Sequence, residues 1–171
     1  MKHIQRSALL PYAQEQLFAM VADIERYTEF LPWLESVVVL PAESVPPESM
    51  PAQNQTQNQA ADRLVEARVQ LKVAGIRESF ITRNHMHPPE RMELELLEGP
   101  FDAFEGFWRF TPLGDATSAN TGCKVELDLR FELSRSNPIV RHTYGALVER
   151  AAGKLVEAFC QRAVVVCDAP A

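Results

Sequence analysis

Hydrophobic and polar residues alternate one by one through much of the chain. The clearest case is the segment 125–133, in which Val, Leu and Phe at odd positions alternate with Glu, Asp and Arg at even positions. Because successive side chains of a β-strand point to opposite faces, this pattern predicts a strand with one buried and one wet face. Similar alternation, or strand-forming composition, predicts further strands at residues 3–10, 35–40, 65–73, 76–84, 92–96 and 104–110.

Three segments instead repeat their apolar residues every three or four positions, which is the spacing of one helical face. They are residues 14–22, residues 23–30 and residues 138 to about 166. Asp23 is the expected N-cap of the second segment. Asn137 and Pro138 suit the cap and the first position of the third. Gly153 lies inside this long predicted helix, where glycine can allow a bend.

The predicted order of elements is a strand, two short helices, about six further strands and one long helix. Strands joined by short turns pair antiparallel, and their alternating polarity leaves one face of the sheet to be covered. The final helix is the one predicted element long enough to cover it. We therefore expect an α+β fold, in which a curved antiparallel sheet of six to seven strands wraps around a long C-terminal helix. A gap remains wherever side chains do not fill the space between sheet and helix.

The composition changes abruptly between Ser44 and Asp62. This stretch holds three prolines, and six of the seven residues from Gln53 to Gln59 are Gln or Asn. Such a segment cannot bury enough apolar surface to offset the entropy lost on ordering. We interpret residues 44–62 as a disordered loop within a single domain spanning residues 1–171, because the chain before the loop is too short to be a domain.

Composition and charge exclude several classes of protein. With 17 Lys and Arg against 23 Asp and Glu, the formal charge is −6, which argues against general capture of nucleic acid and against a DNA partner. No apolar run approaches the length of about 18 residues that a membrane span needs. The cysteines, Cys123, Cys160 and Cys167, form no CxxC pair, which favours reduced thiols in a cytoplasmic protein.

Motifs for catalysis and metal binding are absent from the sequence. No two glycines form a GxG pair, and neither GxSxG nor HExxH occurs. His85 and His87 would share one face of a strand, but a metal site needs three or four ligands and no Cys or further His lies nearby. We interpret them as exposed histidines at a turn. We therefore expect no catalytic residues, no metal site and no required cofactor.

The facing of the predicted strand 76–84 stays open. Glu78 shares the parity of Phe80, so it points inward if the even positions form the inner face. If the odd positions form the inner face, Arg83 becomes the buried charge. Each of these two residues is a candidate for an ionisable group inside the fold.

Aromatic residues are the main positive signal. The segment 27–33 packs Tyr, Phe, Leu and Trp around Pro32, between a short helix and a strand, and such a segment can close an apolar pocket. Trp108 and Phe159 lie on apolar faces of a predicted strand and the last helix. Aromatic residues on apolar faces usually fill a core, and that interpretation stays open beside the pocket.

Several short blocks occur in a characteristic order along the chain. They are residues 6–12 (RSALLPY), 22–33 (ADIERYTEFLPW), 74–84 (AGIRESFITRN), 98–101 (EGPF), 106–110 (GFWRF) and 158–163 (AFCQRA). Together they resemble the coenzyme-Q-binding, polyketide-cyclase-like branch of the START (SRPBCC) superfamily, from about residue 3 to 165. Within that branch the chain is similar to the bacterial subgroup of ribosome association toxins, the RatA subgroup.

This resemblance implies the helix-grip fold, with an internal cavity that binds ubiquinone or a related isoprenoid lipid without catalysis, in support of respiration. Ubiquinone would then be a bound ligand, and its carrier would make transient contact with the inner membrane. We expect the cavity to be lined by Tyr27, Phe30, Leu31, Trp33, Phe80, Phe101, Trp108, Phe110, Tyr144, Val148, Leu155 and Phe159.

The same resemblance implies an alternative function, in which the protein binds the large ribosomal subunit and blocks subunit joining. Contact with RNA needs a cationic surface. The candidates are Arg63, Arg68 and Lys72 on one strand, and Arg141, Arg150, Lys154 and Arg162 on the last helix. The net charge and the interleaved Glu66, Glu149 and Glu157 argue against it. A polyketide cyclase or aromatase is a third hypothesis, ranked lowest because no general acid or base stands out.

Overall fold

The computed structural model describes residues 1–41, 62–73, 75–114, 122–134 and 138–167, with the backbone alone at residues 139, 140, 143 and 144. Its elements are β1 (Lys2–Leu10), α1 (Gln14–Ala22), the 3-10 helix η1 (Ile24–Glu29), β2 (Leu34–Val39), β3 (Arg63–Val73), β4 (Ile76–His87), β5 (Arg91–Glu98), β6 (Phe101–Pro112), β7 (Cys123–Leu133), α2 (Pro138–Gly153) and α3 (Leu155–Cys167). The predicted loop at 44–62 lies outside the described residues, apart from Asp62, and so does the predicted cap Asn137.

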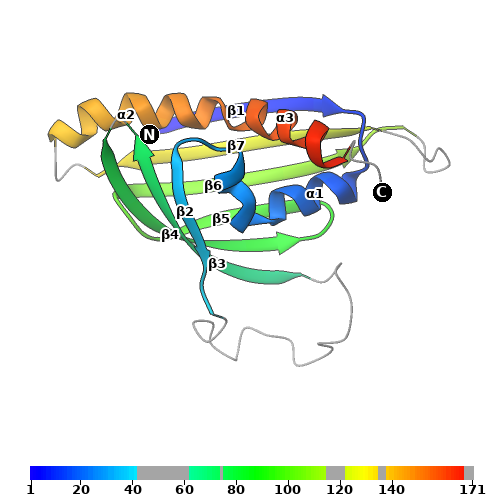
Figure 1. Ribbon diagram of the computed structural model, residues 1–171, viewed down its shortest axis with the longest axis horizontal. Coiled ribbons are helices and arrows are strands. Elements are labelled where there is room, and N and C mark those ends of the chain that lie inside the picture. Colours follow the sequence, from blue (N-terminus) through cyan, green and yellow to red (C-terminus); the bar gives the residue numbers. More distant parts are fainter. Residues whose placement is uncertain (42–61, 74, 115–121, 135–137, 168–171) are drawn as a thin grey trace.

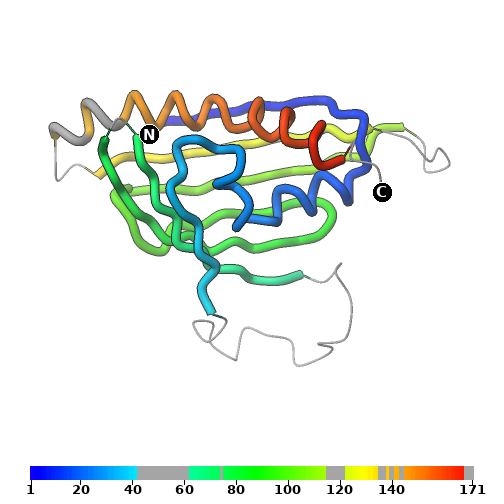
Figure 2. Tube along the Cα trace, viewed as in Figure 1, coloured from blue at the N-terminus to red at the C-terminus, as the bar shows by residue number. Residues whose placement is uncertain are grey.

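The strands form one seven-stranded antiparallel sheet in the order β1-β7-β6-β5-β4-β3-β2. β1 and β2 are therefore the two edges, and the chain passes from one edge to the other through α1 and η1 (Figure 2). Figure 1 shows α2 and α3 lying end to end along the sheet, with α1 beside α3. This confirms the predicted α+β fold with a helix-grip arrangement.

The alternation along each strand decides which face is buried. In β7 every odd-numbered residue from 123 to 131 is buried, while the charged residues between them lie on the outer face. The strand register carries this pattern across the sheet, so that Trp108 of β6 lies opposite Leu127 of β7 on the inner face. The buried residues of α3 that complete this core are Val156, Phe159 and Ala163.

The C-terminal helix is divided, where the sequence predicted one continuous helix. α2 ends at Gly153, Lys154 forms a turn and α3 begins at Leu155. The backbone N–H of Lys154 donates to the carbonyl of Ala151 at 3.1 Å, which is the tighter bonding of a 3-10 turn. Glycine has the weakest helix propensity after proline, which accounts for the position of the break. Among the described helices, none is both long and apolar enough to cross a membrane.

The segment 23–30 also differs in detail from the prediction. It forms the 3-10 helix η1 rather than an α-helix. Asp23 occupies the N-cap position, as predicted, but its side chain makes no capping hydrogen bond. The Asp23 carboxylate instead pairs with the Nε of Arg26 at 3.1 Å. The carboxylate therefore satisfies a nearby guanidinium rather than the free N–H groups at the start of the helix.

The two histidines lie in a strand, and the prediction that they sit at a turn is wrong. β4 continues past the predicted end at residue 84 to His87. The His85 ring lies 3.5 Å from the carboxylate of Glu95, and the His87 ring lies 3.0 Å from that of Asp62. Both histidines are thus half-buried on the outer face, beside acidic partners.

The three cysteines are reduced thiols, as predicted. Burial raises the pKa of Cys123 to about 11; a backbone hydrogen bond at Thr111 lowers it in part, and the charge of Glu15 raises it further. Burial also raises the pKa of Cys160. These two thiols are therefore protonated and poorly nucleophilic near neutral pH.

Polar contacts around Asp128 hold β1 to β7 in addition to the backbone pairing. Nε2 of Gln5 donates to Oδ2 of Asp128 at 2.7 Å, and Nε2 of His3 lies 2.9 Å from Oδ1. Burial by itself would raise the pKa of Asp128, but these hydrogen bonds and the charges of His3 and Arg130 outweigh it and lower the pKa below its ordinary value. The folded protein thus favours the carboxylate form.

We expect Asp128→Asn to lower the free energy of unfolding near neutral pH and to have little effect once the pH is well below the folded pKa of Asp128. The pKa of Asp128 is lower in the folded protein than its unfolded value of about 3.9. The carboxylate therefore contributes its full stabilisation when the pH is above the unfolded pKa, and this stabilisation is lost as the pH falls through the folded pKa. Urea unfolding of both proteins across this range measures the gap. Glu126→Gln, on the same face of β7, is the control for loss of a charge. A gap that stays constant with pH would contradict the prediction.

Candidate functional site

An apolar cavity of about 150 Å³ lies between the inner face of the sheet and the C-terminal helices. Its walls come from η1 and the segment after it, from strands β2 to β7, and from α2 and α3. The cavity lies between sheet and helix, where the family resemblance implied one. The residues that line it are Ile24, Tyr27, Leu31, Trp33, Leu34, Val69, Leu71, Val73, Phe80, Thr82, Asn84, Met92, Leu94, Phe101, Phe104, Gly106, Trp108, Leu127, Leu129, Val148, Ala151, Ala152, Leu155 and Phe159.

Most of the residues that we expected in the wall of a cavity do line this one. They are Tyr27, Leu31, Trp33, Phe80, Phe101, Trp108, Val148, Leu155 and Phe159. As contacts to a ligand they remain predictions. The residues that the sequence analysis missed are chiefly aliphatic side chains of β3, β5 and β7, because each strand contributes its whole inner face and not its aromatic residues alone.

Phe110 lies outside the cavity wall, contrary to the prediction. It is buried, but its ring packs against Phe18 of α1 with centroids 5.5 Å apart and stacks near Trp108 at 6.3 Å. Phe110 therefore packs between Phe18 of α1 and Trp108 of β6. The parity of Phe110 along β6 is as predicted, but a strand of this length extends beyond the cavity. The side chain of Tyr144 lies outside the described part of the chain.

Phe159 of α3 stands at the centre of an aromatic cluster. Its ring makes edge contacts with Tyr27, Phe30 and Trp108, with centroids 5.1, 5.0 and 5.0 Å apart. Phe30 does not line the cavity, contrary to the prediction, because it packs behind Phe159, and the guanidinium of Arg162 lies 5.2 Å from its ring centroid. The cluster ties η1, the segment after it and β6 to the C-terminal helix.

Tyr27 is the one residue with an ionisable side chain in the described cavity wall. Its hydroxyl donates a hydrogen bond to the carbonyl of Val21. Burial raises the pKa of Tyr27 far above its ordinary value, and the charge of Asp23 adds to the effect. The phenol is therefore neutral and already engaged. Within the described part of the chain, no group of three or more His, Cys, Asp and Glu side chains could hold a metal ion.

The structure decides the facing of β4. Its even-numbered positions point inward, so that Phe80, Thr82 and Asn84 line the cavity. Glu78 has the same parity, but it is only half-buried and does not reach the cavity wall. Arg83 lies on the outer face. Neither of the two charged candidates thus places an ionisable group in the cavity.

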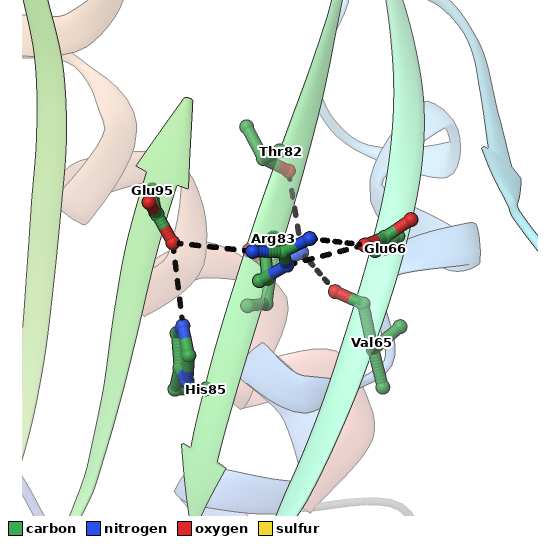
Figure 3. Close-up of polar contacts among 7 residues, drawn as sticks. Val65, Glu66, Thr82, Arg83, His85 and Glu95 are labelled. Atoms are coloured by element: carbon green, nitrogen blue, oxygen red, sulfur yellow. Dashed lines mark hydrogen bonds and ion pairs between the residues drawn. The ribbon is translucent and has the colours of Figure 1, made fainter. Parts of the chain in front are cut away.

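Arg83 forms a part-buried ion pair with Glu66 on the outer face of the sheet (Figure 3). Its Nε and Nη2 donate to Oε1 of Glu66 at 3.1 and 3.0 Å. Glu66 is only 6% exposed, where the sequence pattern indicated a solvated charge. Oε2 of Glu95 lies 3.9 Å from Nη1 of Arg83 and 3.5 Å from the ring of His85, so the network spans β3, β4 and β5.

Thr82 and Asn84 are the polar residues of the wall that sequence reasoning missed. Both are buried, and the side-chain amide of Asn84 donates to the backbone carbonyl of Val65 at 3.0 Å and to Oγ1 of Thr82 at 3.2 Å. The acceptors Val65 and Thr82 are labelled in Figure 3. The sequence does show polar residues at the even positions between Phe80 and Met86. They could not be assigned to the inner face, because the sequence did not decide which face of this strand points inward.

We expect Phe159→Ala to lower the free energy of unfolding by about 3–5 kcal/mol, because removing a packed aromatic ring leaves an unfilled space. Phe159 is 3% exposed and contacts three other rings. Val165→Ala, at a 64% exposed position of the same helix, is the control. It should change stability by less than about 0.5 kcal/mol. Urea unfolding measures both, and equal losses in the two variants would contradict a central role for Phe159.

The chain resembles known proteins along almost its whole length. A family model described as "Polyketide cyclase / dehydrase and lipid transport" matches residues 10–160. The chain is 37% identical over 161 residues to the "Ribosome association toxin RatA" of Pseudomonas aeruginosa, and the match covers 94% of each chain.

Solved structures show the same arrangement of elements. An 18 kDa protein from Caulobacter crescentus, determined in solution, matches with a TM-score of 0.65 and 29% identity, covering 99% of this chain and 100% of that one. A START superfamily protein from Mycobacterium smegmatis matches with a TM-score of 0.57 and 21% identity, covering 94% of this chain and 95% of that one. The second likeness concerns the fold alone.

Proposed function

The chain belongs to the polyketide cyclase / dehydrase and lipid transport family, and we propose that within it the protein is a ribosome association toxin that binds the large ribosomal subunit and blocks subunit joining. The similarity to the Pseudomonas aeruginosa relative of that name carries the proposal, because it extends over nearly the whole of both chains. We propose a cytoplasmic location on the same ground, since ribosomes act there.

A cationic surface on β3 and β4 supports this function. Arg68 and Lys72 are exposed on the outer face of β3, and Lys72 is the register partner of Arg77 on β4. Two cations directly opposite each other on one face of a sheet destabilise the isolated protein. RNA phosphates would relieve that repulsion. Glu35 pairs with Arg77 at 3.1 Å and offsets part of it. We call Arg68, Lys72 and Arg77 the β3–β4 basic surface.

The cations predicted on the C-terminal helix support ribosome binding less well. Arg150 and Lys154 are exposed, but Glu149 is exposed beside Arg150. The guanidinium of Arg162 is engaged within the protein, where it donates to the carboxylate of Glu29 and is only 17% exposed. The helix therefore offers an interrupted positive surface.

We expect the wild-type protein to sediment with the large ribosomal subunit at low salt and to release it as salt is raised. Charge reversal at Arg68 and Lys72 should abolish the binding, because each lost phosphate contact removes part of the electrostatic attraction. Sucrose-gradient co-sedimentation measures the binding, and the fraction of joined subunits in a translation extract measures the inhibition.

The Arg150→Glu, Lys154→Glu double variant is the matched control, because it makes the same change of charge on the helix. It should retain binding. Retained binding by the β3–β4 variant together with loss in the helix variant would move the contact to the helix. Failure of the wild-type protein to sediment with either subunit would refute the ribosome function.

The cavity supports a second function, and we propose that the protein also binds an apolar ligand there. Its wall is built almost wholly from aliphatic and aromatic side chains, and burying apolar surface stabilises by roughly 25 cal/mol per Å². The described wall holds no carboxylate, imidazole or amine for acid–base work. We therefore propose binding without catalysis in place of a polyketide cyclase or aromatase reaction.

The size of the cavity limits what can enter. Its volume of about 150 Å³ is close to that of a protein cavity that holds a single benzene molecule. A six-membered ring with small substituents or one isoprene unit matches this scale, but a polyprenyl tail does not. We propose that an isoprenoid quinone would place its ring inside and its tail outside, where transient contact with the inner membrane could supply it.

We expect organic extraction of the protein from its native host to release a stoichiometric quinone or other lipid, identified by mass spectrometry. Val148→Arg should abolish the recovery, because Val148 lines the cavity and a guanidinium there excludes an apolar ligand. Val165→Arg, on the exposed side of α3, is the control with the same substitution and should retain the ligand. An empty wild-type protein would contradict the ligand function and leave the ribosome function untouched.

A further inference from the structure

Two polar side chains stand out in the wall of the cavity. Apart from the aromatic residues Tyr27, Trp33 and Trp108, the described lining residues with polar side chains are Thr82 and Asn84. They are 4% and 1% exposed, on neighbouring inward positions of β4. Apolar side chains of β5, β6 and α3 share the cavity with them. An apolar pocket with a few convergent polar groups is the usual form of a small-molecule site.

The hydrogen bonds within this pair define which hydrogen-bonding group remains for a ligand. The amide nitrogen of Asn84 faces the carbonyl of Val65 at 3.0 Å, which requires a donor there and so fixes the orientation of the amide. The second amide proton goes to Oγ1 of Thr82 at 3.2 Å. A threonine hydroxyl that accepts a hydrogen bond still carries a proton to donate, and it can turn that proton towards the cavity.

The position of the pair argues for more than local structure. Asn84 satisfies the Val65 carbonyl, but that contact uses only one of its two amide protons. Thr82 places a buried hydroxyl at a position that valine, which has nearly the same shape, would fill without any polar group. Burying a hydroxyl without a full set of hydrogen bonds is unfavourable. A ligand oxygen that accepts from Thr82 would remove this disadvantage.

We propose that Thr82, oriented by Asn84, is the hydrogen-bonding anchor for a single neutral oxygen of a ring-sized ligand, of the phenol or quinone class. The inference rests on the proposed ligand function of the cavity. The Thr82 hydroxyl donates to the ligand oxygen, while the aromatic and aliphatic wall holds the ring. A carboxylate or phosphate is excluded from the site, because no cationic side chain lines the described wall and a buried anion would be unpaired.

Two probes of nearly equal shape test the anchor. p-Xylene and p-cresol differ by a methyl group in place of a hydroxyl, and titration calorimetry or ligand-detected NMR measures their affinities for the full chain. In a cavity without an anchor, the ratio of the two binding affinities should equal the ratio of the probes' partition coefficients from water to cyclohexane. We expect p-cresol to bind wild-type protein about tenfold more tightly than that ratio allows, the effect of one hydrogen bond.

Thr82→Val removes the hydroxyl and keeps the shape. It should lower the affinity for p-cresol about tenfold and leave that for p-xylene nearly unchanged. Thr82→Ser keeps a hydroxyl and should bind p-cresol about as tightly as the wild-type protein does. Thr111→Val, at an exposed position of β6, is the control with the same substitution and should change neither affinity. If Thr82→Val does not fold, the comparison of the wild-type ratio with the transfer ratio still decides the question.

The outcomes separate the anchor from the cavity. If wild-type protein binds both probes in the cyclohexane ratio, or if Thr82→Val weakens both equally, the anchor is refuted while the cavity function stands. If wild-type protein binds neither probe, the cavity function fails and the anchor fails with it.

Discussion

The packing of the C-terminal helices against the inner face of the sheet is the constraint on which the rest of the structure depends. An antiparallel sheet with one apolar face must bury that face, and here α2 and α3 do so along its length. Phe159 joins the layers most directly, because its ring touches residues of η1, β6 and the segment after η1. The curved sheet and the helices do not fill the space between them completely, and the cavity is the space that remains.

The alternation of side chains gives the two faces of the sheet different chemistry. β4 shows this most clearly, since Thr82 and Asn84 face the cavity while Arg83, between them, reaches across the outer face to Glu66. A slip of one residue in the register of β4 would exchange these roles, burying a guanidinium in the cavity and exposing the polar pair. The Glu66–Arg83 ion pair opposes such a slip, because it forms in the observed register and because Glu66, which is only 6% exposed, would otherwise be a buried charge without its partner.

The two proposed functions use opposite faces of this sheet. Ribosome binding would use the β3–β4 basic surface, where Lys72 lies opposite Arg77 and Glu35 offsets only part of the positive charge. Ligand binding uses the inner face, whose volume admits one ring but not a polyprenyl tail. Because the sheet separates the two sites, a variant that alters one leaves the contacts of the other intact. The two functions can therefore be tested independently in one protein.

The sequence by itself determined the order of the elements and the buried face of most strands. These follow from local periodicity, as in the alternation of residues 125–133, which became β7 with every predicted apolar position facing inward. Most of the wall residues expected from the family resemblance also line the cavity. The tertiary structure decided the facing of β4, the exclusion of Phe30 and Phe110 from the wall, the break at Lys154 and the burial of Glu66. Each of these depends on which residues of other elements lie opposite, and local periodicity along one strand or helix does not contain that information.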